Sequence, residues 1–159
     1  MCILAVLLTA SAQSSEEFQA RVIGVADGDT ITVLRDKIPV RIRLDGIDCP
    51  EGGQDFSQRA KTFASQMVFG KTVTVVAKDT DKYGRTVARI LVDGQDLSLA
   101  LVQAGLAWHY VQYSNDQVLA AAEVDARQIG IGLWSLKSPV PPWEFRRPSA
   151  VLNSQGRNT

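Results

Sequence analysis

The sequence has little cysteine and no excess of charge of either sign. Cys2 and Cys49 are the only cysteines. Loss of an N-terminal signal would leave Cys49 as the single thiol, so the mature chain could form no internal disulfide. The 17 basic and 17 acidic residues balance, which excludes a strong overall field toward a polyanion. A site for a polyanion must therefore be a local arrangement of charges.

Long hydrophobic runs are also missing. A membrane span takes roughly 20 apolar residues, and no apolar run of that length occurs here. Residues 1–12 are nonetheless apolar and end in Ala10-Ser11-Ala12, a small-residue pattern that signal peptidases accept. The usual positive charge ahead of the apolar run is absent, so residue 1 need not be the true start. We expect a signal peptide over residues 1–12 rather than an ordinary buried segment, and a secreted or periplasmic monomer without membrane attachment.

The 159 residues are 45% hydrophobic and 21% charged, which suits one globular domain with its own core. Two β-branched runs flank Asp27-Gly28, a turn signal that predicts a hairpin over residues 18–33. Similar composition predicts three further strands, over residues 40–44, 72–77 and 86–92.

Apolar residues recur at helical spacing in three segments, and a glycine stands near the end of each or directly after it. We predict helices over residues 54–69, 97–106 and 117–129. Five short strands, interrupted by one helix and followed by two more helices, indicate an α+β fold. The expected architecture is a five-stranded Greek-key barrel of the oligonucleotide-binding type with three α-helices.

Past Ser135 the composition changes to a proline-rich run that ends in Trp-Glu-Phe-Arg-Arg. Such a run favours an extended, polyproline-like segment, which Trp143 and Phe145 are expected to pin to the domain. Residues 149–159 are expected to be disordered. The predicted organisation is a signal peptide, one domain and a tail, over residues 1–12, 18–136 and 137–159.

Three polar clusters, over residues 27–30, 43–51 and 81–85, supply carboxylates and guanidinium groups. A hard cation such as Ca²⁺ takes oxygen ligands, and Asp29 and Asp48 could provide two if barrel closure brings them together. Phosphodiester hydrolysis needs an activated water and stabilisation of the charge on the phosphate. Glu51, Ca²⁺ and two arginines could share these tasks.

Strand alternation restricts the second cluster. Arg43 must point away from the face that Ile42 and Leu44 bury. Asp48 has the parity of the buried residues, so a regular strand would aim its carboxylate at the core. We therefore expect a turn or bulge near Gly46.

Each cluster alone also has a structural interpretation. Asp27-Gly28 can be only a turn, Arg43 with Glu51 only a surface ion pair, and residues 81–85 only a solvated loop tip. His109, the single histidine, is expected to be partly buried packing. Cys49 is expected to be a small semi-buried residue and not a nucleophile, because no Cys-His signature accompanies it.

Taken in order, five motifs resemble the staphylococcal nuclease (thermonuclease) family: Val-Ala-Asp-Gly-Asp-Thr-Ile, Arg-Leu-Asp-Gly-Ile-Asp-Cys-Pro-Glu, Asp-Lys-Tyr-Gly-Arg, Leu-Val-Gln-Ala-Gly-Leu-Ala and Gly-Leu-Trp. The C-terminal run is similar to that of bacterial exported members. The resemblance implies calcium ligands, a catalytic trio and substrate contacts. The calcium ligands would be Asp29, Asp48 and the carbonyl of Cys49. The catalytic trio would be Arg43, Glu51 and Arg85. The substrate contacts would be Lys82, Tyr83 and Tyr110, with Tyr113 as the alternative tyrosine.

The function that the resemblance implies is a calcium-dependent, sugar-nonspecific nuclease. It would hydrolyse DNA and RNA, prefer single strands and leave products that end in 3′-phosphate. One alternative is a noncatalytic nucleic-acid- or protein-binding barrel of the same fold. The charged residues that argue against it are Asp29, Arg43, Asp48, Glu51 and Arg85. Another is a metal-stabilised structural domain, which would have no use for two arginines placed to bind phosphate.

Overall fold

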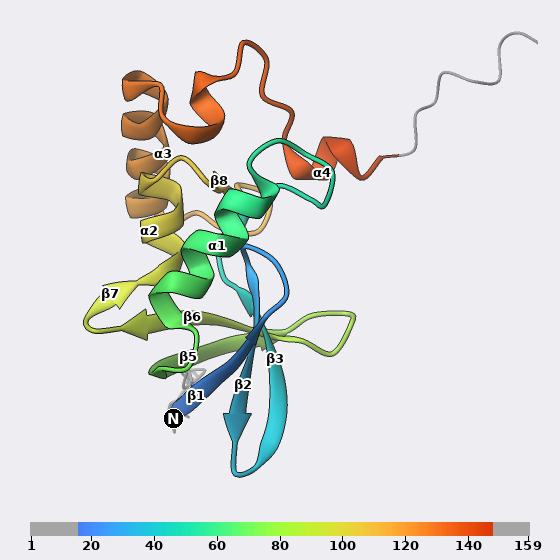
Figure 1. Cartoon of the computed structure of the whole chain (residues 1–159), viewed down its shortest axis with the longest axis vertical. Helices are drawn as coiled ribbons and strands as arrows, with labels where there is room; N and C mark the ends of the chain where they lie inside the picture. Colours follow the sequence, from blue (N-terminus) through green and yellow to red (C-terminus); the bar gives the residue numbers. More distant parts are fainter. Residues whose placement is uncertain (1–15, 148–159) are drawn as a thin grey trace, which may run out of the picture.

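Five strands pair edge to edge until the sheet closes on itself (Figure 1), as seen in a computed structural model that describes residues 16–147. Their order is β3-β2-β1-β5-β6, and β3 also pairs in parallel with β6, with Ile42 opposite Thr86. This closure confirms the predicted α+β barrel. The strands are β1 (Glu16–Val25), β2 (Thr30–Arg35), β3 (Ile38–Leu44), β5 (Thr72–Thr80) and β6 (Thr86–Val92).

Three two-residue strands complete the pairing. They are β4 (Ile47–Asp48), β7 (Gln95–Asp96) and β8 (Trp108–His109). β4 and β8 form a separate antiparallel pair in which Asp48 lies opposite Trp108. This small sheet ties the segment after β3 to the segment after the second helix.

The three predicted helices are present as α1 (Ser57–Val68), α2 (Leu97–Gln103) and α3 (Gln117–Ile129). Asp96 and Asp116 cap α2 and α3, and each side chain accepts hydrogen bonds from two backbone amides of the first turn. Gly70 and Gly130, which follow α1 and α3, take the left-handed conformation with φ of 75° and 73°.

The barrel interior and the inner faces of the helices form one apolar core. Among its fully buried side chains are Val22, Ile31, Ile42, Leu44, Val75, Ile90, Leu97 and Leu101. Away from the barrel, the backbones at Gly105 and Gly132 touch, and Leu133 donates its amide to the carbonyl of Gly105 at 2.8 Å. This contact joins the end of α2 to η1, a 3₁₀ helix over Gly132–Ser135.

The prediction of an extended C-terminal segment is wrong at one place. A short helix, α4 (Pro142–Phe145), forms there with proline at its first position, where the missing N–H and the fixed φ favour a helix start. Trp143 packs on Trp108 and Tyr110 and so pins the segment as expected. Phe145 is 49% exposed, so its predicted anchoring role is wrong.

The predictions for residues 1–12 and 149–159 lie outside the described residues. Within residues 16–147, no helix combines the length and the apolar character that a membrane crossing requires.

Candidate active site

A cleft of about 690 Å³ contains most of the side chains that the sequence singled out. They come from the β1–β2 turn, the end of β3 and β4, the β5–β6 loop, and the segment after β8. Segments far apart in the chain therefore meet at this cleft. The predicted residues that line it are Asp29, Arg43, Asp48, Glu51, Lys82, Tyr83, Arg85 and Tyr110.

Asp29 is held by the turn that precedes β2. Its own amide donates to the Asp27 carboxylate at 3.1 Å, and its Oδ2 accepts a hydrogen bond of 2.7 Å from the backbone amide of Cys49. Leu44 also donates its amide to the carbonyl of Asp29, at 2.9 Å. The Asp-Gly turn is therefore more than a chain reversal, since it brings Asp29 against the residues after β3.

Arg43 leaves β3 on the side opposite Ile42 and Leu44, which are buried, as alternation requires. The chain then turns at Gly46, with φ of 78°, and the carboxylate of Asp48 points back to Arg43. Nη2 of Arg43 lies 2.9 Å from Oδ1 of Asp48 and 3.4 Å from Oδ2 of Asp29. The predicted turn near Gly46 is confirmed, and Arg43 pairs with these two aspartates in place of the surface pair with Glu51.

The two aspartates are almost inaccessible, with exposed fractions of 6% and 1%. Burial raises the pKa of Asp29 to about 7, and the Arg43 guanidinium offsets only part of that rise. Burial works against a charged Arg43 too, yet the carboxylates of Asp29 and Asp48 raise its pKa above the ordinary value. The guanidinium of Arg43 thus contacts two buried carboxylates at once.

Arg85 is oriented by its own loop. Its Nε donates to Oδ2 of Asp81 at 2.7 Å, while Oδ1 of Asp81 accepts from the amides of Tyr83 and Arg85. Burial opposes the ionised form, but these hydrogen bonds lower the pKa of Asp81. Nη1 of Arg85 lies 3.4 Å from the hydroxyl of Thr30, so the β5–β6 loop is ordered toward the cleft and is not just a solvated tip.

Glu51 has a partner that the sequence did not predict. Arg146, just after α4, donates from Nη1 to Glu51 and from Nη2 to Oδ2 of Asp48 at 2.7 Å. These carboxylates raise the pKa of Arg146, with the hydrogen bond to Asp48 as the main cause. The signal in the sequence was the Arg-Arg pair beside two aromatic residues, in a run that we assigned to an extended tail.

An aromatic group forms one side of the cleft. Tyr110 stacks on Trp143 with ring centroids 5.1 Å apart and planes at 4°, and it meets Tyr113 edge-on. Both tyrosines line the cleft, so the fold presents either one to a ligand. On the opposite loop, Lys82 and Tyr83 are exposed, with the Lys82 ammonium 5.0 Å from the Tyr83 ring.

The structural interpretation holds for the two remaining candidates. His109 is 5% exposed, and its Nε2 lies 3.2 Å from the hydroxyl of Ser114. Cys49 is buried, and burial raises the pKa of its thiol well above the ordinary value. A protonated buried thiol is inert, which agrees with the prediction that Cys49 is not a nucleophile.

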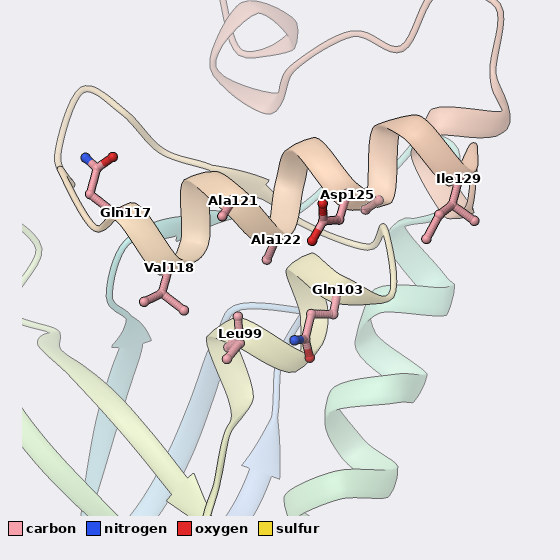
Figure 2. Close-up of a pocket in the computed structure, with 9 residues that line it drawn as sticks. Leu99, Gln103, Gln117, Val118, Ala121, Ala122, Asp125 and Ile129 are labelled. Atoms are coloured by element: carbon pink, nitrogen blue, oxygen red, sulfur yellow. The ribbon is translucent and has the colours of Figure 1, made fainter.

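A second depression, a groove between α2 and α3, has a different character (Figure 2). It is lined by Leu99, Gln103, Gln117, Val118, Ala121, Ala122, Asp125, Ala126 and Ile129 and shares no residue with the cleft. With one ionisable side chain, it offers no set of groups for catalysis. The cleft is therefore the candidate active site.

The donors available to a metal are few. Among residues 16–147, no three or more side chains of His, Cys, Asp and Glu gather in a way that would hold an ion. A cation in the cleft would therefore take the oxygens of Asp29 and Asp48 together with backbone carbonyls and water. Two neighbouring buried carboxylates suit a hard divalent ion.

The protein is a closed barrel of the oligonucleotide-binding type with carboxylates and arginines in one cleft. These features place it in a class of small barrel proteins that act on phosphodiester bonds. The profile of the family described as staphylococcal nuclease homologue matches residues 41–136. The chain belongs to the staphylococcal nuclease family, and it is a nuclease of the hydrolase class.

Bacterial relatives align over most of the chain. A protein named uncharacterized endonuclease from Haemophilus influenzae is 37% identical over 150 residues, covering 94% of this chain and 84% of that protein. One with the same name from Escherichia coli is 44% identical over 131 residues, or 82% and 86% of the two chains. The micrococcal nuclease of Shigella flexneri is 35% identical over 156 residues, or 91% and 90%.

Proposed function

We propose that the protein is a calcium-dependent nuclease that hydrolyses phosphodiester bonds of DNA and RNA, with preference for single strands. The observation that carries this proposal is the convergence of Arg43, Glu51 and Arg85 on one cleft beside two buried carboxylates. The family resemblance supports the sugar-nonspecific activity and the 3′-phosphate ends of the products.

Asp29, Asp48 and the backbone carbonyl of Cys49 would hold Ca²⁺. When bound, the ion would neutralise the buried carboxylates and polarise a phosphate oxygen. The fit rests on the donor set, because Asp29 and Asp48 are buried carboxylates that contact the same guanidinium, and carboxylate oxygens are the ligands that Ca²⁺ prefers.

Glu51 would act as the general base for the attacking water. Its side chain is 38% exposed at the cleft, so a water molecule can reach it. The water oxygen forms the new bond to phosphorus and its proton passes to Glu51, while the bond to the 5′ oxygen breaks. The 5′ oxygen takes a proton from solvent and leaves as a 5′-hydroxyl, and the phosphate remains on the 3′ side.

Arg43 and Arg85 would bind the phosphate from two sides. The planar guanidinium group pairs with two phosphate oxygens at once, and a preoriented donor lowers the free energy of a charged transition state. The hydrogen bonds that Arg85 donates to Asp81 and that Arg43 donates to Asp48 provide that orientation.

Lys82, Tyr83 and Tyr110 would bind the rest of the nucleotide. Stacking of bases on exposed aromatic rings is sequence-tolerant and needs unpaired bases, which supports a preference for single strands. The stack of Tyr110 on Trp143 fixes the orientation of the Tyr110 ring.

The test is release of acid-soluble nucleotides from denatured DNA by the purified protein, with Ca²⁺ or with a calcium chelator. We expect release only with Ca²⁺, faster than from duplex DNA, and with RNA as a further substrate. Labelled products then report whether the phosphate stays on the 3′ end. A folded sample that binds oligonucleotide but releases nothing would support the noncatalytic alternative.

A further inference from the structure

Arg146 places a positive charge beside two carboxylates of the cleft. It contacts both Asp48 and Glu51, the carboxylates to which we assign metal binding and general-base catalysis. Its side chain is 41% exposed and lines the same cleft as Arg43 and Arg85. A third guanidinium therefore faces the volume that the substrate phosphate would enter.

The segment that carries Arg146 is anchored at two points ahead of it in the chain. The amide of Gln54 donates to the carbonyl of Val140 at 2.9 Å, and its Oε1 accepts from the backbone amide of Glu51 at 2.9 Å. Trp143 stacks on Tyr110. The position of Arg146 is thus built into the fold, and the same anchors connect it to Glu51 and to the aromatic side of the cleft.

Charge determines what this arginine can do. Asp29, Asp48 and Glu51 together carry three negative charges when ionised, against two positive charges from Arg43 and Arg146. A divalent cation changes that deficit of one into an excess of one. The carboxylates then no longer need Arg146, and its charge is available to an anion.

We propose that Arg146 is a phosphate-binding residue that is held by Asp48 and Glu51 in the metal-free protein and released to the substrate when a divalent cation binds Asp48. This inference rests on the proposed function, since it assumes a cation at Asp48. It adds a residue from outside the predicted catalytic trio, and it makes cation binding and substrate binding reinforce each other.

Calorimetric titration of the metal-free protein with Ca²⁺ tests the first half. Arg146→Gln should bind Ca²⁺ about tenfold more tightly, because the ion no longer displaces charge-assisted hydrogen bonds. Arg147→Gln is the matched control. It removes the same charge one residue further on, where the exposed side chain makes no ion pair among the described residues, and its affinity should stay within about twofold of the wild type.

Steady-state kinetics on a single-stranded oligonucleotide at saturating Ca²⁺ test the second half. Arg146→Gln should raise KM about tenfold with kcat within about twofold, since the contact binds phosphate before the chemical step. Arg146→Lys keeps the charge without the fork, so its values should lie between. It also replaces the glutamine variant if that one does not fold.

Equal Ca²⁺ affinities or equal KM values for Arg146→Gln and Arg147→Gln would overturn the inference. A purely structural role predicts the same loss of thermal stability with and without Ca²⁺, whereas the proposed role predicts the larger loss in the metal-free protein. If the wild type releases no nucleotides with Ca²⁺, the proposed function fails and the phosphate role of Arg146 fails with it. The two failures are distinguishable, because the inference about Arg146 can fail while the wild-type protein is an active nuclease.

Discussion

The backbone amide of Cys49 donates a 2.7 Å hydrogen bond to the side chain of Asp29, 20 residues earlier in the chain. This bond closes the gap between the β1–β2 turn and the segment after β3. It also explains why the Cys49 side chain has no chemical role, because the backbone makes the contact and the thiol is buried. The site is therefore assembled largely by main-chain geometry around a few charged side chains.

Glu51→Gln tests the proposed general base. The substitution keeps the shape and should leave the fold intact, while hydrolysis should slow by about 10² to 10⁴-fold, the usual contribution of a positioned base. The measurement is kcat on denatured DNA, with circular dichroism to verify folding. Glu17→Gln, at an exposed position of β1, serves as the control. Near-normal activity of Glu51→Gln would refute this role.

Asp81→Asn tests whether the orientation of Arg85 matters. Loss of the charge weakens the 2.7 Å bond to Arg85 and the two amide contacts. We expect kcat to fall about tenfold, less than the roughly 10²-fold or larger loss on removal of the guanidinium itself in Arg85→Ala. Asp93→Asn removes an exposed aspartate that pairs with Lys71 and should have no effect. An active site indifferent to Asp81→Asn would mean that Arg85 needs no support.

The raised pKa of Asp29 predicts a pH effect on the metal-free protein. The folded value is about 7 against an ordinary 3.8, so the folded state holds the proton more tightly. This contribution to stability is full below about pH 4 and is lost as the pH rises through about 7. Urea unfolding in chelator should therefore show the wild type losing stability relative to Asp29→Asn between about pH 4 and 7.

The control for that experiment is Asp55→Asn, an exposed position, whose profile should run parallel to the wild type. If the Asp29→Asn profile also ran parallel, the carboxyl of Asp29 would be ionised over the whole range and our account of its burial would be wrong.

Gly105→Ala tests the contact between the end of α2 and η1. A Cβ there would lie 2.4 Å from the carbonyl oxygen of Ile131, and φ is 66°. Strain and overlap together should lower the free energy of unfolding by about 2 to 4 kcal/mol. Gly52→Ala, where a Cβ meets nothing within 4 Å, should change it little. The two melting temperatures decide the matter, and equal values would contradict the close approach.

Local patterns predicted the elements whose ends carry their own signals. The helix over 117–129 was predicted with its observed limits, because Asp116 caps its start and Gly130 ends it. The helix predicted over 54–69 is shorter, Ser57–Val68, since its first residues turn back on Glu51 through Gln54. The two-residue strands β4 and β8 were not predicted, because only their mutual pairing makes them strands.

The candidate site, like the fold, could be predicted from the sequence only in part. Strand alternation and the turn at Gly46 could be predicted from adjacent residues, and with them the side on which Arg43 projects. The ion pairs could not, because partners such as Asp48 and Arg146 lie 98 residues apart along the chain. Aromatic anchors such as Trp143 indicated a packed tail but not what the following arginine would contact.

The sequence by itself determined the order of the main strands and helices, which follows from short-range periodicity. It also supplied the set of charged residues and the ordered motifs that carry the family resemblance. Tertiary structure decided that Arg43 serves two aspartates, that Asp81 orients Arg85 and that Arg146 reaches Asp48 and Glu51. The physical reason is that a charge pair depends on distance and burial in space. Both arise only when the barrel closes and the C-terminal segment packs on Tyr110.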